Sequence, residues 1–374
     1  MALATSAQEY KIFQYDNGDD YIREGLRRIF DSTGKIGYAD DNGKVIIAPR
    51  FAFAFPFEDG VAKVTDEGRS VSEGEHYRWV SPDWYFIDHS GNEVGRERRY
   101  AQIEQLLETF VKAKDARIGI AVIINGKDTV SVNGTKDFPM MSVFKFPQAL
   151  AVADYCQKSG IGLTDSIFIK SGEMKENTWS PMRDKYGVRD LALPVSELLD
   201  YTLQQSDNNA CDILFRLIGG TSVADSLMKS LGYEDILITH TEDEMHRDPY
   251  LCYLNRATPI EMARLFDRFF REEMRHDSQF HEFIAASMMS CQTGLDRLPA
   301  PLTHTDAMIG HKTGTGDRNS LGRIMAVNDA GYIYLTDKTG YSIAVFVADS
   351  AYDMTETSKI IADISEIVFL SLKN

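Results

Sequence analysis

A serine and a lysine with the spacing of a nucleophile and its base stand at the head of an apolar segment. Ser142 and Lys145 lie three residues apart, before the apolar run 146–156. Three residues make about one helical turn, so the lysine amine can reach the serine hydroxyl. A serine becomes nucleophilic when a nearby base takes its proton, and a helix start offers free N–H groups to an oxyanion. The pair therefore predicts acyl transfer through a serine ester.

Two tripeptides further along the chain strengthen this prediction. The Ser-x-x-Lys spacing also occurs at 32–35 and 226–229, so it is weak evidence by itself. After Ser142 come Ser206-Asp207-Asn208, at a separation of 64 residues, and Lys312-Thr313-Gly314, another 106 residues on. Ser-x-x-Lys, Ser-Asp-Asn and Lys-Thr-Gly together are a signature of class A β-lactamases and penicillin-binding proteins. The order of the three motifs favours a functional site.

From about residue 101 to 374 the chain resembles class A serine β-lactamases. Trp179 stands where the family has an aromatic gate before the Ser-Asp-Asn loop. Arg297 follows Thr293-Gly294 and stands where some members have an arginine that anchors the substrate carboxylate. The planar fork of arginine suits that task, and a surface ion pair is the alternative.

The resemblance implies a serine mechanism that needs no metal or cofactor. Ser142 would attack the β-lactam carbonyl, and Lys145, or Glu242 through a water, would take its proton. Ser206 would pass a proton to the leaving nitrogen, beside the positive charge of Lys312. The resemblance also implies an oxyanion hole formed by the N–H groups of Ser142 and Thr315. Asn208 would bind the substrate side-chain amide. The residues around the substrate carboxylate would be Lys312, Thr313, Gly314, Thr315 and Arg297.

Hydrolysis of the acyl-serine requires a carboxylate that holds a water against the ester. The resemblance places this carboxylate 36 residues after Ser206, at Glu242. Glu244 is a competing candidate, and a solvated acidic loop without catalytic function is a third interpretation. The pattern Glu-x-x-Met-His from Glu242 to His246 resembles a divergent extended-spectrum branch of the family and favours Glu242.

The chain departs from the commoner family pattern around this loop. His246 and Asp212 each replace an asparagine, and a histidine can donate to a carboxylate, so we expect the two to support the loop together. His240 and Asn255 occupy the positions of an Arg–Asp salt bridge, which therefore cannot form. We expect a differently folded, wider loop.

The elements that position these residues are typical of an α+β domain. Apolar runs at 118–124 and 129–132 flank Asn125-Gly126 and predict a hairpin. Residues 142 to about 290 have a mostly helical pattern, which predicts an all-helical subdomain. Strands are predicted at 323–327, 332–336 and 341–347, and a helix at 358–372. We expect the strands from the two ends to form one antiparallel sheet with flanking helices, an α/β sandwich.

The first 98 residues predict a small β-rich domain of repeated hairpins. Asn42-Gly43 separates two apolar runs, and the pattern returns at 85–94 after a shift of 48 residues. Residues 60–64 similarly echo 25–29. The region resembles a degenerate pair of WG-type repeats, and two copies are few for a freestanding array, so it could contact a protein or cell-wall partner. The charged stretch 95–99 predicts a boundary between domains 1–98 and 99–374.

The composition of the chain argues against several classes of function. The chain has 374 residues, 43% of them hydrophobic, and a net charge of −16, which argues against a nucleic-acid partner. No apolar run reaches the length of a membrane span. The four cysteines form no C-x-x-C pair, so we expect free thiols, and H-E-x-x-H is absent. We expect a monomer.

The compartment is predicted from the substrate rather than from a leader. Residues 4–8 resemble the small-residue end of a leader peptide, and a disordered cytoplasmic terminus is the alternative. Because β-lactams act outside the inner membrane, we expect a periplasmic or secreted enzyme, with a cytoplasmic location left open.

Three rival functions stay open at this level. A penicillin-binding D,D-peptidase or β-lactam sensor would acylate at Ser142 without rapid turnover. A binding protein would use the N-terminal repeats and keep a vestigial catalytic domain. A Ser-x-x-Lys esterase is the third.

Overall fold

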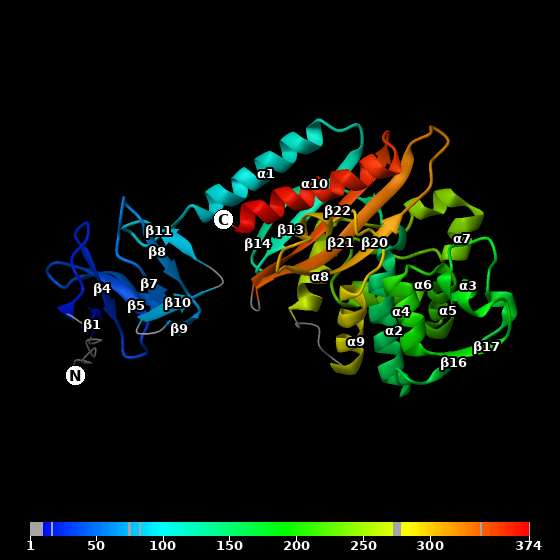
Figure 1. Cartoon of the computed structure of the whole chain (residues 1–374), viewed down its shortest axis with the longest axis horizontal. Helices are drawn as coiled ribbons and strands as arrows, with labels where there is room; N and C mark the ends of the chain where they lie inside the picture. The colour runs from blue at the N-terminus through cyan, green and yellow to red at the C-terminus, as the bar shows by residue number, and fades with distance from the viewer. Residues whose placement is uncertain are drawn as a thin grey trace, which may run out of the picture. The chain divides into compact units, whose positions relative to one another are not determined.

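The computed structural model describes residues 10–15, 18–73, 76–81, 84–271, 278–336 and 339–373. The leader-like residues 4–8 lie outside the described residues. The chain separates into two compact units, Met1–Gln102 and Ile103–Asn374, so the division falls inside helix α1 (Arg96–Lys112) (Figure 1). Among the described residues, none of the helices combines the length and the apolar character that crossing a bilayer would need.

The second unit is built on an antiparallel sheet with strand order β14-β13-β22-β21-β20. Strands from the two ends of the unit pair in its centre, where Arg117 lies opposite Ala348 and Ile124 opposite Tyr341. This confirms the predicted sheet and the α+β fold class. The strands are β13 (Arg117–Ile124), β14 (Asp128–Val132), β20 (Met308–Thr315), β21 (Ile324–Thr336) and β22 (Thr339–Ser350).

The structure corrects the strand assignment beside Lys312. The predicted strands 323–327 and 332–336 are one strand, β21, and the edge strand β20 is a strand that the apolar pattern does not predict. The polar residues Asn328 and Asp329 break the apolar pattern, yet both are fully buried. Asn328 Nδ2 donates to the carbonyl of Met140 at 3.0 Å, and Asp329 pairs with His311 at 2.9 Å. Because each buried polar group has a partner, the strand continues through them.

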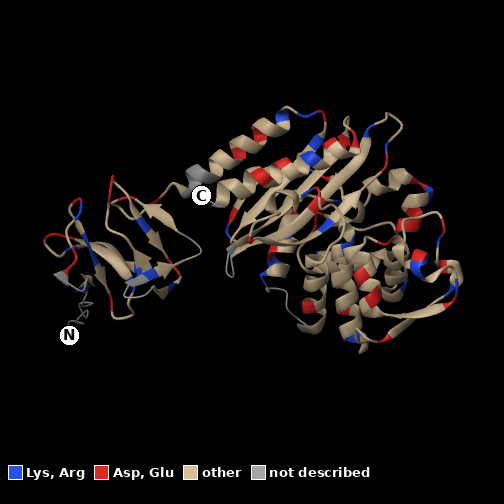
Figure 2. Ribbon diagram, in the orientation of Figure 1, with Lys and Arg blue, Asp and Glu red and all other residues tan. Residues whose placement is uncertain are grey.

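Helices cover both faces of the sheet. α10 (Met354–Lys373) packs on β21 and β22, and α8 (Pro259–Phe270) packs on the other face, beside the helical subdomain (Figure 1). Lys, Arg, Asp and Glu positions are frequent along the helices and in the loops, while the strands of the sheet are mostly other residue types (Figure 2). The remaining helices are α2 (Lys145–Ser159), α3 (Pro181–Tyr186), α4 (Val195–Gln204), α5 (Asn208–Ile218), α6 (Thr221–Ser230), α7 (Glu242–Arg247) and α9 (Ser278–Met289), with short turns η1 (Met141–Phe144), η2 (Ser171–Glu173), η3 (Pro249–Tyr253) and η4 (Ala300–Leu302).

Small strand pairs complete the second unit and fix the loops around the subdomain. β15 and β18 both pair with β19, and β16 pairs with β17. These strands are β15 (Phe138–Pro139), β16 (Ser166–Ile169), β17 (Leu191–Pro194), β18 (Ile236–Leu237) and β19 (Arg256–Ala257).

The first unit consists of repeated hairpins, as predicted. The backbone N–H groups of Asp40 and Asp88, 48 residues apart, each donate to the carbonyl four residues on, at 2.9 and 2.8 Å. Gly43 and Gly91 take the left-handed conformation that both turns need, with φ of 80° and 79°. The strands are β1 (Lys11–Ile12), β2 (Gln14–Tyr15), β3 (Gly18–Asp19), β4 (Leu26–Phe30), β5 (Ile36–Asp40), β6 (Val45–Phe51), β7 (Phe53–Ala54), β8 (Ala62–Thr65), β9 (Arg69–Glu73), β10 (His76–Val80), β11 (Tyr85–Ile87) and β12 (Glu93–Val94).

Candidate active site

Ser142 lies in the short turn η1, immediately before α2, and its backbone is held under strain. Met141, just before it, has a φ of 47°, in a region that side chains other than glycine rarely adopt. Backbone strain of this kind persists where the surrounding structure fixes it, and it gathers at functional sites. Here the surroundings are strand β20 and the start of α2, which hold η1 between them.

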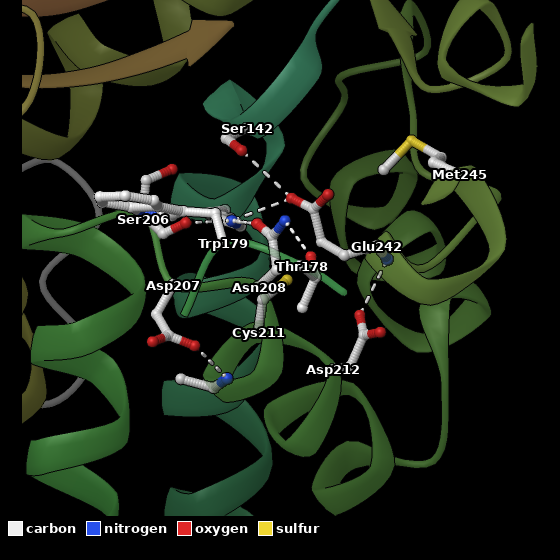
Figure 3. A network of polar contacts seen from close by, with 12 residues as sticks. Ser142, Thr178, Trp179, Ser206, Asp207, Asn208, Cys211, Asp212, Glu242 and Met245 are labelled. Carbon is white, nitrogen blue, oxygen red and sulfur yellow. Dashed lines mark hydrogen bonds and ion pairs between the residues drawn. The ribbon is translucent and has the colours of Figure 1, made fainter. Parts of the chain in front are cut away.

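Ser142 and Lys145 meet through Glu242 rather than directly. Ser142 Oγ donates to Glu242 Oε1 at 3.1 Å, and Lys145 Nζ lies 2.9 Å from the same oxygen (Figure 3). The expected hydrogen bond from the lysine amine to the serine hydroxyl is not among the contacts of these two described residues. The sequence pattern places the two side chains on one side of the helix start, but the tertiary fold inserts a carboxylate between them.

The amine of Lys145 is fully surrounded by oxygen acceptors. Besides Glu242, Nζ donates to the carbonyl of Ser206 at 2.8 Å and to Asn208 Oδ1 at 2.6 Å. The side chain is fully buried. An ammonium group has three N–H donors, which matches the number of these oxygen acceptors. In this arrangement the carboxylate of Glu242, and not the lysine, accepts the serine hydrogen bond.

The structure separates Glu242 from its competitor Glu244. Glu244 belongs to a capping box at the start of α7: its carboxylate accepts the N–H of Thr241 at 2.9 Å, and its own N–H donates to Thr241 Oγ1 at 3.3 Å. A capping box satisfies two free N–H groups of a helix start. Glu244 therefore has a structural function, and Glu242 is the carboxylate at the serine.

Asp212 holds the loop through backbone N–H groups, and a hydrogen bond to His246 is not among the contacts of these two described residues. The two oxygens of Asp212 accept the N–H groups of Glu242 and Asp243, both at 2.8 Å. Burial, and then the charge of Glu242, raise the pKa of Asp212 to about 7. Asp212 thus supports the loop by holding the start of α7, while His246 lines the cavity beside it.

Asn255 replaces the missing Arg–Asp salt bridge with hydrogen bonds to the loop backbone. Its Oδ1 accepts the N–H groups of Thr239 at 2.8 Å and His240 at 2.9 Å, and its Nδ2 donates to the carbonyl of His240 at 2.8 Å. Asn255 is fully buried. The sequence pattern does not reveal this anchor, because an amide in a loop carries no periodic signal.

Ser206 and Lys312 form the second polar centre. Lys312 Nζ donates to Ser206 Oγ at 3.0 Å, and Ser206 has a left-handed φ of 57°. Burial, opposed in part by neighbouring anions, lowers the pKa of Lys312 to about 8. Between the motif's serine and asparagine, the fully buried Asp207 accepts the N–H groups of Met182 and Ala210 at 2.7 and 2.9 Å. Asp207 is thus a structural residue that holds the motif in place, a role the sequence left unassigned.

Asn208 and Trp179 are neighbours at the Ser-Asp-Asn loop, where the backbone N–H of Asn208 donates to the carbonyl of Trp179 at 3.0 Å. Asn208 Nδ2 donates to Thr178 Oγ1 at 2.8 Å, a partner that the motifs do not reveal. The indole of Trp179 is 61% exposed and donates to the carbonyl of Gln205 at 2.9 Å. Trp179 therefore stands as an exposed ring beside the Ser-Asp-Asn loop.

Several of the predicted residues line one cavity of about 290 Å³. Ser142, Asn208 and Glu242 face it, while the fully buried Lys145 and Lys312 stand behind them. The complete lining is Met141, Ser142, Thr178, Asn208, Glu242, Met245, His246, Pro249, Cys252, Thr315, Gly316, Asp317 and Met325.

Comparison with known proteins identifies the family. Residues 99–372 match the Beta-lactamase enzyme family, and residues 36–69 match the WG containing repeat. The chain belongs to the class A β-lactamases. A crystal structure of a class A β-lactamase from Bacteroides cellulosilyticus superposes with a TM-score of 0.70 at 40% identity, covering 73% of this chain and 98% of that one. A β-lactamase of Bacteroides uniformis is 36% identical over 75% of this chain and 94% of its own length. The extended-spectrum β-lactamase PER-1 of Pseudomonas aeruginosa is 30% identical over 71% and 86%.

In this β-lactamase Arg297 is neither a surface ion pair nor part of the cavity lining. It is 6% exposed, and its guanidinium donates to Thr315 Oγ1 at 2.7 Å and to the carbonyls of Gly314 and Asn328 at 3.1 and 3.0 Å. Arg297 is therefore connected to the cavity through its hydrogen bond to Thr315, which is one of the lining residues. Thr313 is buried beside it, 2.5 Å from the hydroxyl of Thr293.

Gly314 allows β20 to lie close against the turn that carries Ser142. A Cβ at this position would lie 2.5 Å from the carbonyl oxygen of Met140 and 3.2 Å from the backbone nitrogen of Ser142. We expect Gly314→Ala to push β20 away from the nucleophile and to lower kcat/KM for a cephalosporin by up to about 10²-fold, the usual effect of a misplacement near 1 Å. Gly172→Ala is the control, because that Cβ meets open space. Unchanged kcat/KM for Gly314→Ala would contradict the close contact.

Proposed function

We propose that this β-lactamase opens β-lactam rings through an acyl-enzyme on Ser142, which water activated by Glu242 then hydrolyses. The observation that carries the proposal is the shared oxygen of Glu242, which contacts both Ser142 Oγ and Lys145 Nζ in one cavity. A carboxylate at hydrogen-bond distance from a serine hydroxyl is positioned as a general base. Family membership supports the substrate class.

In acylation, Glu242 takes the proton of Ser142 as Oγ attacks the carbonyl. Lys145, with its three donors occupied, is the ammonium that balances the carboxylate and faces the developing charge. The N–H groups of Ser142 and Thr315 hold the oxyanion, a contact that lowers the barrier by about 3 kcal/mol per donor. Ser206 passes its proton to the leaving nitrogen and regains one from Lys312. The proton that Glu242 took from Ser142 passes to water, which reprotonates Lys312 and leaves Glu242 ionised for deacylation.

The cationic side of the cavity binds the substrate carboxylate. Lys312, Thr313 and Thr315 lie along β20 and present an ammonium and two hydroxyls, and Arg297 contributes through Thr315. Gly314 lets the strand lie close to Ser142. Asn208 takes the substrate side-chain amide, and Trp179 stands at the rim. These assignments require no metal or cofactor.

Residues 99–374 are proposed as the catalytic domain and residues 1–98 as a binding domain for a protein or cell-wall partner, supported by the match to the WG containing repeat. A periplasmic or secreted, monomeric enzyme with no nucleic-acid partner fits the substrate and the net charge of −16.

The test is hydrolysis of a chromogenic cephalosporin by the whole chain, together with mass spectrometry of the intact protein. We expect turnover and a short-lived adduct that peptide mapping places on Ser142. A long-lived adduct without turnover would instead indicate a penicillin-binding protein or sensor. Neither turnover nor adduct would exclude both functions.

A further inference from the structure

A thiol, an imidazole and a carboxylate lie buried together behind Lys312. Cys291 follows α9, His311 precedes Lys312 on β20, and Asp329 lies on β21. The three side chains are 8%, 2% and 0% exposed. The imidazole Nδ1 lies 2.9 and 3.1 Å from the two oxygens of Asp329, and the charge of His311 acts on the thiol of Cys291. The mechanism proposed above uses none of these three groups.

Hydrogen bonds connect this cluster to the residues around the substrate carboxylate. Cys291 Sγ lies 3.4 Å from Thr293 Oγ1, which lies 2.5 Å from Thr313 Oγ1. Asp329 pairs in register with Thr313 and accepts the N–H of Leu298, the neighbour of Arg297, at 3.2 Å. The cluster therefore contacts both segments that form the cationic side of the cavity.

The cluster has a net negative charge at neutral pH and above. Burial opposes ionisation of Cys291, yet His311 and Lys312 lower the pKa of its thiol to about 7. Burial also opposes protonation of His311, but Asp329 and Cys291 raise its pKa to about 10. One imidazolium then lies between two anions, and one negative charge is left to face Lys312.

Lys312 needs this negative charge because its surroundings disfavour an ammonium group. Burial lowers the pKa of Lys312 most, Lys145 on α2 lowers it further, and Cys291, Asp329 and Glu242 raise it. The charge of Cys291 also acts on Arg297. Among the described residues, no three His, Cys, Asp or Glu side chains are arranged to hold a metal ion.

We propose that Cys291, His311 and Asp329 form a positioning unit that keeps Lys312 protonated and Thr313 oriented, and so sets the upper pH limit for binding the substrate carboxylate. The inference rests on the proposed function only in assigning that carboxylate to Lys312 and Thr313. Cys291 is the member whose ionisation changes the charge of the unit.

The test measures benzylpenicillin binding against pH by calorimetry in a Ser142→Ala background, where no acyl-enzyme forms. We expect affinity to fall above a midpoint near pH 8, where Lys312 loses its proton. Adding Cys291→Ser removes the ionisable thiol and should move this midpoint to lower pH, with affinity unchanged below the pKa of the thiol. Cys156→Ser is the matched control, because burial raises the pKa of that thiol to about 11, and it should leave the midpoint in place.

A second readout needs no ligand. Thiolate absorbance of the free enzyme should rise near pH 7 and vanish in Cys291→Ser, since burial raises the pKa of the thiols of Cys156, Cys211 and Cys252. An unmoved midpoint, no thiolate near neutral pH, or an equal loss of affinity at every pH would overturn the proposal. Absence of penicillin binding would overturn it together with the proposed function. Binding without turnover by the wild type would count against the proposed function alone.

Discussion

Glu242→Gln should convert the enzyme from one that turns over into one that is trapped as an acyl-enzyme. The amide keeps the size of the side chain but cannot accept a proton from water, so we expect deacylation to slow by about 10²- to 10⁴-fold. Acylation should persist, because the buried Lys145 is then the group that can take the proton of Ser142. Mass spectrometry of the intact protein, with peptide mapping, should find a stable adduct on Ser142.

Glu244→Gln is the matched control for this prediction. It makes the same chemical change two residues away, and its amide oxygen can still accept the N–H of Thr241 in the capping box. We expect turnover close to that of the wild type. A trapped adduct in Glu244→Gln, with normal turnover in Glu242→Gln, would reverse the assignment of the two glutamates.

Lys145→Met should stop the reaction one step earlier. Methionine matches the length of the lysine stem but offers no donor, so the carbonyl of Ser206 and the side chains of Asn208 and Glu242 lose the ammonium group. The alkoxide that forms on Ser142 would no longer face a positive charge. We expect the acylation rate, measured by rapid mixing with a chromogenic cephalosporin, to fall by about 10²- to 10⁴-fold with no accumulation of adduct.

Lys158→Met on the same helix controls for the loss of a lysine from α2. That side chain is 72% exposed and pairs with Asp154, so its removal should leave acylation unchanged. The two active-site variants also have opposite signatures, since Glu242→Gln accumulates the adduct and Lys145→Met does not. Rapid acylation by Lys145→Met would show that Glu242 activates Ser142 without the ammonium.

The sequence by itself determined the motifs, the family and much of the architecture. The hairpins at Asn42-Gly43 and Asn125-Gly126 follow from local turn chemistry, which needs few residues and no distant partner. The family assignment follows from short motifs in a fixed order, and the comparisons confirm it. Spacing also singled out Glu242, although the proximity of Glu244 left the choice open.

Tertiary structure decided what each polar side chain contacts. Glu242 lies 100 residues from Ser142 in the chain, and only the fold places its carboxylate between the serine and Lys145. Strand β20 escaped prediction because an edge strand with buried polar residues lacks the apolar alternation on which pattern reading depends. The hydrogen bonds that hold the buried Arg297, and those from Asn255 to the loop backbone, also join residues that are separated in the sequence. Residue type shows which hydrogen bonds a side chain can make, whereas the packing of distant segments decides which of them form.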